Sequence, residues 1–140
     1  MLKAQIRKRL GELILSIDLS VAKGITVLRG ESGSGKTTIA NLLSGALKPD
    51  EGEIELEGRS VFSTARSINL APEARGIGFV FQTARLLPHL SVEENIRFPQ
   101  TAGRRRPRVD FAEVVEIVGL ERLLHRHPGS LSCGEGQRVA

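Results

Sequence analysis

A glycine-rich segment that ends in lysine and threonine is the part of the sequence best suited to chemistry. Residues 30–38 read GESGSGKTT and fit the phosphate-loop pattern G-x-x-x-x-G-K-[S/T] at every fixed position. Glycines allow backbone conformations that are closed to residues with a Cβ, and they let N–H groups come close to a phosphate chain. The segment predicts a nucleotide phosphate site, and the alternative is a glycine-rich turn that matches by chance.

Several groups of this loop have a predicted task. Its N–H groups and the N-terminus of the following helix present partial positive charge to an anion. Lys36 adds a full cation for the β- and γ-phosphates, Thr37 offers a hydroxyl to Mg²⁺, and Thr38 reaches the α-phosphate. The predicted phosphate-binding residues are Gly30, Glu31, Ser32, Gly33, Ser34, Gly35, Lys36, Thr37 and Thr38.

The segments on either side of the loop must hold it in place. Residues 25–28 read ITVL, and this short apolar β-branched run predicts a buried parallel strand. Residues 39–43 have apolar side chains at helical spacing. Strand, glycine-rich turn and helix are the structural context in which a phosphate loop functions. A second buried strand is predicted at 77–81 (IGFVF).

Alternating patterns predict further strands. Apolar and polar residues alternate in the later part of 12–20 and throughout 53–57, so both segments predict half-buried strands. Residues 48–52 form a predicted turn that contains proline and glycine, and 60–62 is the expected partner of 53–57.

The later part of the chain predicts helices. A short helix is expected at 92–96 with Ser91 as its N-cap. A second is expected at 111–118, between Asp110 as N-cap and Gly119 at its C-terminal end. This change from strands to helices predicts an α/β core that is followed by a helical segment.

Composition narrows the class of protein. The chain has 140 residues, of which 40% are hydrophobic, which suits one soluble globular domain, or one and a part. No apolar run is long enough to span a membrane, and the N-terminus has no apolar signal core. A single cysteine, Cys133, argues against a secreted disulfide scaffold. A cytoplasmic protein is expected.

The basic charge is local. Lysine and arginine number 20 against 16 acidic residues, a net charge of +4, and four arginines in one short segment account for the whole excess. That segment, 99–109, contains two prolines and a glycine and is predicted to be a solvated loop. Without tyrosine or tryptophan to stack on bases, a nucleic-acid partner is not expected. The four residues are Arg104, Arg105, Arg106 and Arg108.

Three further stretches carry a family resemblance. Gln82 follows the predicted strand 77–81, residues 83–96 read TARLLPHLSVEENI, and residues 131–140 read LSCGEGQRVA. Together with the phosphate loop, they resemble the nucleotide-binding subunits of ABC transporters. Within that family, residues 70–82 and the short N-terminal hairpin are most similar to the ATP-binding subunits of molybdate importers. Sulfate, iron and polyamine importers share much of the same pattern.

The resemblance implies a fold and a division of the chain. The fold class is α/β, a P-loop NTPase core of the ABC ATPase type with an N-terminal antiparallel β subdomain and part of a helical subdomain. Residues 1–82 would form the ATP-binding core with the antiparallel β subdomain. Residues 83–140 would form the Q-loop region and the helical subdomain, which is truncated in the signature helix.

The resemblance also implies a mechanism. Two subunits would sandwich two ATP molecules, with Lys36 acting on the ATP held in cis. Ser132, Gly134 and Glu135 would face the γ-phosphate of the partner's ATP. Gln82 would complete the Mg²⁺ shell with Thr37 and sense the γ-phosphate; the plain alternative is a surface glutamine.

The partners that the resemblance implies follow from this mechanism. They are a second ATP-binding subunit, integral-membrane permease subunits that would contact residues 83–96, and, indirectly, a periplasmic or extracellular substrate-binding protein. The protein would be peripheral on the cytoplasmic face of the bacterial cell membrane. The expected function is ATP-driven import of an oxyanion, molybdate in the first place.

The sequence departs from the family pattern at several positions. Cys133 stands where the signature has its first glycine, so we expect weaker ATP-driven closure, which Cys133→Gly would restore as a higher ATPase rate. Gly136 replaces a residue that is usually basic. Near Leu10 the family has an aromatic side chain for adenine, so adenine would rest on aliphatic surface here. The sequence stops at Ala140, before the general-base glutamate, so residues 1–140 alone are expected to be poorly soluble and without ATPase activity.

Other functions remain open at this point. A non-transport ABC ATPase and a remnant that binds nucleotide without hydrolysing it are both compatible with the sequence. A small P-loop kinase would not explain Gln82 or residues 131–140. The three histidines lack metal-ligand spacing and are interpreted as surface residues. Arg75 either lies near the nucleotide or is a charged surface residue.

Overall fold

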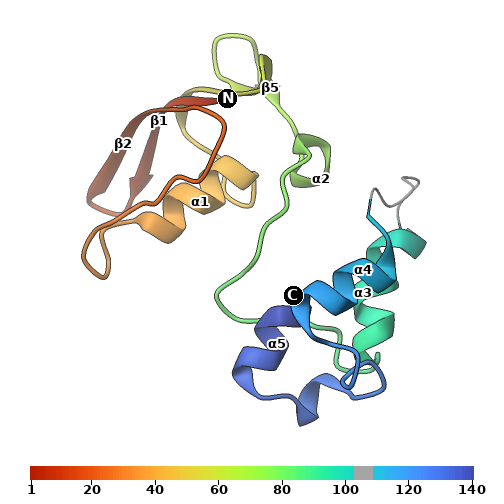
Figure 1. Cartoon of the computed structure of the whole chain (residues 1–140). Coiled ribbons are helices and arrows are strands. Elements are labelled where there is room, and N and C mark those ends of the chain that lie inside the picture. Colours follow the sequence, from red (N-terminus) through yellow and green to blue (C-terminus); the bar gives the residue numbers. More distant parts are fainter. Residues whose placement is uncertain (103–108) are drawn as a thin grey trace. The chain divides into compact units, whose positions relative to one another are not determined.

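The computed structural model describes residues 1–102 and 109–140. Within them the chain divides into two compact units, Met1–Phe79 and Val80–Ala140 (Figure 1). The four arginines that account for the net charge, Arg104, Arg105, Arg106 and Arg108, lie outside the described residues. A division of function at residue 82 stays a prediction, since compactness alone does not assign it.

The first unit is built on one antiparallel sheet whose strands are ordered β2-β1-β3-β4-β5. The predicted hairpin partners pair as expected, and β3 begins two residues earlier than the pattern 53–57 indicated. Two helices complete the unit, α1 (Lys36–Ser44) and α2 (Pro72–Arg75). The strands are β1 (Leu2–Leu10), β2 (Leu13–Val21), β3 (Glu51–Leu56), β4 (Arg59–Ser63) and β5 (Ile68–Asn69).

One face of this sheet forms the core of the first unit. Alternate residues of a strand point to the same face, so the inward positions of β1 are Ala4 and Ile6, both buried. Ile54 from β3 joins them, and Leu42 of α1 is completely buried in the same cluster. The helix that follows the predicted phosphate loop is therefore anchored to the sheet by an apolar contact.

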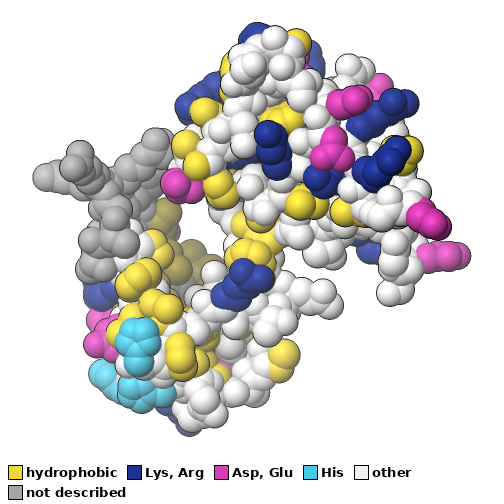
Figure 2. Space-filling view, turned by 180° about the vertical axis from the view of Figure 1, so that it is seen from behind, with side chains coloured by type: hydrophobic (Ala, Val, Ile, Leu, Met, Phe, Trp, Pro, Cys, Tyr) yellow, Lys and Arg dark blue, Asp and Glu magenta, His cyan; other side chains and the backbone are white. Residues whose placement is uncertain are grey.

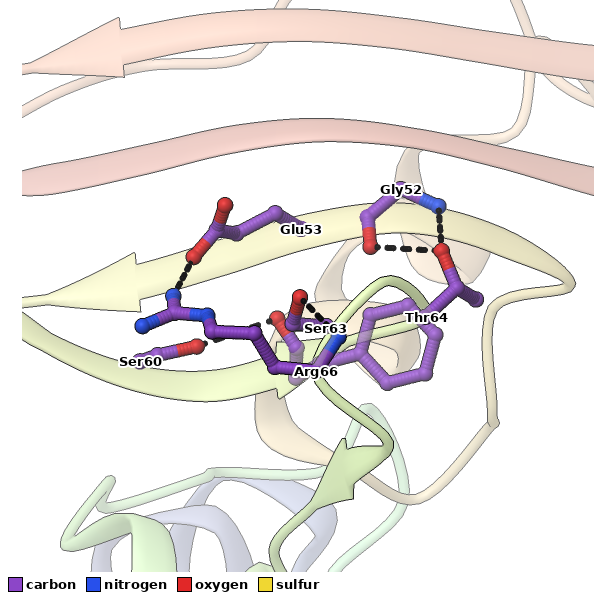
Figure 3. A network of polar contacts seen from close by, with 7 residues as sticks. Gly52, Glu53, Ser60, Ser63, Thr64 and Arg66 are labelled. Carbon is purple, nitrogen blue, oxygen red and sulfur yellow. Dashed lines mark hydrogen bonds and ion pairs between the residues drawn. The ribbon is translucent and has the colours of Figure 1, made fainter.

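Strands β1 and β3 come unusually close at Gly52. Its φ is 108°, and a Cβ added there would lie 1.9 Å from the carbonyl oxygen of Gln5. The Gly52 N–H donates to Thr64 Oγ1 at 3.1 Å, and the Thr64 N–H donates to the Gly52 carbonyl at 3.0 Å. Figure 3 shows this contact beside an ion pair between Glu53 and Arg66. Glycine is required at position 52 because any side chain would collide with backbone.

The second unit consists of short helices around a small apolar core. The helices are α3 (Val92–Ala102), α4 (Phe111–Val118) and α5 (Cys133–Val139), with a 3-10 turn, η1 (Pro128–Ser130). The buried residues of its core are Val115, Leu120 and Leu123. Leu131 and Val139 pack against them, which attaches α5 to the rest of this unit.

Helix ends agree with the predictions in part. The Glu94 N–H donates to Ser91 Oγ at 3.2 Å, which confirms the predicted cap of α3. Gly119 ends α4 in the left-handed conformation, as predicted. Asp110 has the extended backbone of an N-cap, but its side chain makes no capping hydrogen bond. The loop predicted from residue 99 is wrong at its start, because α3 continues through Pro99, where proline removes only one helical hydrogen bond.

Both predicted buried strands are absent from the structure. Residues 25–28 and 77–81 are irregular, and no strand pairs with either of them among the described residues. Ile25 is 97% exposed, Val27 73% and Val80 62%, so these apolar side chains lie in solvent. A parallel strand exists only where a neighbour accepts and donates its backbone hydrogen bonds, and an apolar run cannot supply that neighbour.

Candidate nucleotide-binding site

The predicted phosphate loop is a compact turn at the N-terminus of α1. Gly33 and Gly35 have φ values of 83° and 90°, in the left-handed region that favours glycine. The Ser34 N–H donates to the Glu31 carbonyl at 3.2 Å and closes the turn. Gly35 is the N-cap of α1, so Lys36 and Thr37 begin the helix. Two of the glycines are thus required by the conformation of the loop.

The Lys36 side chain folds back across this turn. Its Nζ donates to the carbonyl oxygens of Gly30 at 2.8 Å and Glu31 at 2.6 Å. A weaker contact joins it to Ser34 Oγ at 3.4 Å. A Cβ added to Gly30 would lie 2.7 Å from Ser34 Oγ, so a side chain there would fill the space that the turn encloses. These contacts hold the ammonium group centrally in the loop.

The start of α1 is suited to an anion. No side chain of the described residues caps it, and its first turn contains no acidic residue. The first N–H groups of a helix have no partner within the helix and carry the positive end of its dipole. Ser32 and Thr37 are exposed beside them, and Thr38 is half-buried. The Thr37 hydroxyl can serve as an Mg²⁺ ligand, because this ion takes oxygen ligands and usually keeps several waters, so it needs few ligands from the protein.

The signature-like segment forms a second helix start, at α5. Ser132 is its N-cap, and the Glu135 N–H donates to Ser132 Oγ at 3.3 Å. The Ser132 N–H in turn donates to the Glu135 carboxylate at 2.7 Å, which completes a capping box. A hydrogen bond from the Ser132 side chain lowers the pKa of Glu135 most, and the hydrogen bond from the Ser132 N–H lowers it further. Cys133 and Gly134 are exposed in the first turn.

Helix α5 holds the segment that contains Gln82. Gln137 Nε2 donates to the Phe81 carbonyl at 2.9 Å, immediately before Gln82. Gly136 is buried, and a Cβ added to it would lie 3.6 Å from the Ala84 side chain, an ordinary contact. Gln82 itself is exposed. Sequence reasoning missed Gln137, whose only signal was its place in the signature-like segment.

A second missed residue, Asn95, fixes the turn before α3. Its side-chain oxygen accepts from the Leu87 N–H at 2.7 Å, and Nδ2 donates to the carbonyls of Leu87, Leu90 and Ser91. Four hydrogen bonds from one side chain set the course of the predicted permease-contact segment. No sequence signal distinguished Asn95 from other residues of α3.

The structure assembles the predicted residues in two groups. The phosphate-loop residues lie together in the first unit, and Ser132, Gly134 and Glu135 lie together in the second. Gln82 also belongs to the second unit, so its meeting with Thr37 at one metal ion stays a prediction. Both interpretations of Arg75 are wrong: its side chain is buried, and it contacts the C-terminal end of α1, opposite to the loop.

The surface offers few other candidate sites. Figure 2 shows positive and negative side chains interspersed over one face of the first unit, and histidines gathered on the second. Hydrogen bonds from the backbone and the side chain of Ser91 lower the pKa of Glu94, and electrostatic attraction to His127 and His89 lowers it further. No group of three candidate ligands among residues 1–102 and 109–140 could hold a metal ion. In the same ranges, no helix has the length and apolar character needed to cross a membrane.

Comparison with known proteins then assigns the family. A family model described as ABC transporter matches residues 15–140, and the chain belongs to this family. The chain is 48% identical to a molybdenum import ATP-binding protein of Paramagnetospirillum magneticum and 47% identical to one of Mannheimia succiniciproducens. Both alignments cover the whole chain but only 39% of the relative. The recognised family and the similarity to molybdate importers are confirmed.

Solved structures support the same assignment. The ATP-binding cassette MJ0796, a dimer in a post-hydrolysis state with ADP and Pi bound, matches with a TM-score of 0.77 and 30% identity. The match covers 99% of this chain and 66% of the cassette. A second structure, of the same dimeric bacterial cassette, matches with a TM-score of 0.75. The predicted fold class, an α/β P-loop core of the ABC ATPase type with a partial helical subdomain, is confirmed.

Proposed function

We propose that this chain is the ATP-binding part of an ABC importer that couples ATP hydrolysis to uptake of molybdate. The observation that carries the proposal is the turn at residues 30–35, which encloses the Lys36 ammonium group at an uncapped helix start. Such an arrangement suits a triphosphate, because it combines fixed amide dipoles with one full cation.

In this proposal the loop residues divide the work of holding the phosphates. Lys36 exchanges its carbonyl partners at Gly30 and Glu31 for the β- and γ-phosphate oxygens. The amides around Gly33 and Gly35 donate to the phosphate chain. The side-chain oxygens of Thr37 and Gln82 would hold Mg²⁺, and the ion would neutralise phosphate charge. Exposed Leu10, at the end of the β1–β2 hairpin, provides aliphatic surface for the adenine ring.

The signature-like segment serves the second subunit of a dimer. Ser132, Gly134 and Glu135 face the γ-phosphate of the ATP that the partner holds in cis. The support is the family relationship together with the exposure of Ser132 and Gly134 at the first turn of α5. Each complete site then draws residues from two copies, and binding of ATP drives the copies together.

The molybdate assignment and the partners follow from the relatives. Proteins named for molybdenum import are 42–49% identical over nearly all of this chain. The partners are a second ATP-binding subunit, permease subunits that contact residues 83–96 at the cytoplasmic face of the membrane, and, through them, a substrate-binding protein.

A direct test measures binding of a fluorescent ATP analogue to the full-length protein. Lys36→Ala removes charged hydrogen bonds worth about 1.5–3 kcal/mol each, so affinity should fall by about 10- to 100-fold. Lys48→Ala removes an exposed lysine of the same unit and should leave affinity unchanged. Equal affinity of Lys36→Ala and the parent protein would refute the proposed site.

Transport requires a separate measurement. Cells that lack the protein should lose high-affinity uptake of radiolabelled molybdate and recover it when the parent protein is supplied, but not the Lys36→Ala variant. Uptake of sulfate in the same cells is the matched control. Loss of sulfate uptake with unchanged molybdate uptake would keep the importer class and overturn the substrate.

A further inference from the structure

Arg75 is a buried cation in the first unit. It is the last residue of α2, and only 6% of its surface is exposed. Nε donates to the Leu70 carbonyl at 3.0 Å, and one Nη donates to Asn69 Oδ1 at 3.3 Å. The other Nη donates to the carbonyls of Leu42 at 3.0 Å and Leu43 at 2.9 Å. The guanidinium group therefore joins α2 and β5 to the C-terminal end of α1.

These bonds satisfy carbonyl groups at the C-terminal end of α1. The last four carbonyls of a helix have no partner within it. The Asn41 carbonyl accepts from the N–H groups of Gly45 and Leu47, and those of Leu42 and Leu43 accept from Arg75. Leu42 is fully buried, so water could not replace the guanidinium group at its carbonyl without opening the core.

The packing around the guanidinium group is specific. Gly45 follows α1 with a φ of 89°, and a Cβ added there would lie 2.6 Å from Arg75 Nε and 2.8 Å from Cζ. The left-handed glycine that ends the helix thus also makes room for the arginine. Lysine, with one ammonium group, could not reproduce this planar set of donors.

The charge of Arg75 acts on α1. Among the residues that the structure describes, no carboxylate forms an ion pair with it. Burial lowers the pKa of the guanidinium, which nevertheless stays charged in proteins. Its positive charge therefore faces the negative end of the α1 dipole, where a cation is stabilising.

We propose that Arg75 is a positioning residue for the nucleotide site: it fixes the far end of the helix that bears the phosphate loop. The inference rests on the proposed nucleotide site. Helix α1 has nine residues and is about 13 Å long, so it moves as a rigid rod. A tilt at its C-terminal end is carried to the amides and Lys36 at its start.

The other contacts of α1 constrain its orientation less than Arg75 does. Residues 25–30, which precede the loop, lack regular structure, and Ile25 and Val27 are exposed. Leu42, which is fully buried, and the partly buried Ile39 and Leu43 pack the helix against the sheet. Apolar contacts of this kind are non-directional, so they leave small rotations of the helix unopposed. Arg75 adds bonds in several directions at the end of the rod and removes this freedom.

The experiment separates positioning from stability in the full-length protein. Thermal unfolding and the Kd of a fluorescent ATP analogue are measured for Arg75→Gln, Arg75→Lys and Ile17→Val, with Kd taken well below each melting temperature. Ile17→Val trims the same apolar core without touching a bond of Arg75. We expect Arg75→Gln to weaken affinity about tenfold, which is the effect of losing about one charged hydrogen bond to the phosphates. Ile17→Val should bind as the parent protein does.

Arg75→Lys provides a partial rescue, and two results would overturn the inference. Arg75→Lys keeps the charge and should recover part of the affinity, because one ammonium group can still reach a helix carbonyl. If Arg75→Gln does not fold, Arg75→Lys decides, and an affinity equal to the parent's would overturn the inference. Unchanged affinity of folded Arg75→Gln would do the same. Lys36→Ala in the same assay tests the proposed site itself, so the two failures are distinguishable.

Discussion

The starts of α1 and α5 are two helix N-termini of opposite design. At α1 no side chain caps the first turn, and the lysine that follows Gly35 bonds to loop carbonyls. At α5 Ser132 and Glu135 cap each other's backbone. One start leaves its amides for a ligand, and the other already donates its Glu135 N–H to a side chain of the same turn.

The difference shows how each region can meet a phosphate. An anion at α1 finds amide dipoles and a cation already in place. An anion at α5 meets a helix start where a carboxylate, stabilised by Ser132, is already present, so it must share the Ser132 hydroxyl with the Glu135 N–H. This contrast agrees with the proposal that the first region binds ATP firmly in cis and the second only completes the partner's site.

Alanine at one glycine of each region tests this contrast most strongly. Gly35→Ala forces a side chain into a left-handed conformation, at a cost of about 1–2 kcal/mol, and its Cβ would lie 3.4 Å from Leu15. Distortion of the loop should also weaken ATP binding in cis by about tenfold. The measurements are urea unfolding and the binding assay above.

Gly134→Ala is the matched control for that experiment. Position 134 has no positive φ, and a Cβ added there meets nothing within 4 Å. Stability should change by less than about 0.5 kcal/mol, as for an unconstrained surface site. Equal effects of the two alanines would contradict the claim that only the first loop depends on glycine for its shape.

Removal of the α5 cap is expected to have a smaller effect. Ser132→Ala deprives the Glu135 N–H of its acceptor and should destabilise the second unit by about 1 kcal/mol. Ser132→Thr retains a hydroxyl and should lose less. Hydrogen exchange of the α5 amides measures the effect, and ATP binding in cis should not change. A weaker cis affinity would show that the two helix starts are not independent.

Acidification should also distinguish the two helix starts, and its expected effect is the smallest of these tests. Because the folded pKa of Glu135 is lowered, its stabilising contribution is complete above the unfolded value of about 4.3 and is lost as pH falls through the folded pKa. Glu94, bonded to the Ser91 N–H at 2.7 Å, follows the same course. Amide NMR signals at the starts of α3 and α5 should therefore titrate at a pH below the ordinary glutamate value of about 4.3.

The α1 amides provide the reference in that titration. The first turn of α1 holds no carboxylate, so its signals should move little over the same range. A large shift at Lys36 or Thr37, in step with Glu135, would contradict the independence of the two helix starts.

Local signals allowed the turns and helix ends of the candidate site to be predicted. The glycine turn before α1, the cap at Ser91 and the C-terminal glycine of α4 each depend on a few neighbouring residues, and each is present in the structure. Phosphate binding by the glycine turn stays a proposal. Antiparallel hairpins were also predictable, because their partners are adjacent in sequence. The signature-like segment was found by resemblance, and its capping box follows the pattern of serine followed three residues later by glutamate.

Features that depend on distant residues could not be predicted. The apolar runs 25–28 and 77–81 suggested strands, but strand formation needs a neighbour that local pattern does not reveal. Arg75 had the composition of a surface residue, and only the fold shows that carbonyls more than thirty positions away accept its hydrogen bonds. Gln137 was missed for the same reason, since its acceptor at Phe81 is 56 residues away.

The pairing of β1 with β3 has a consequence for the order in which the protein acquires its site. Leu2–Arg7 pair with Glu51–Leu56, so the phosphate loop and the whole of α1 lie in the segment that this pairing closes. A growing chain releases the loop from the ribosome before β3 has emerged from it. Closure of so long a segment is slow relative to local hairpins and helices. The loop is therefore synthesised early but becomes a fixed receptor late, when Gly52 has docked beside Gln5.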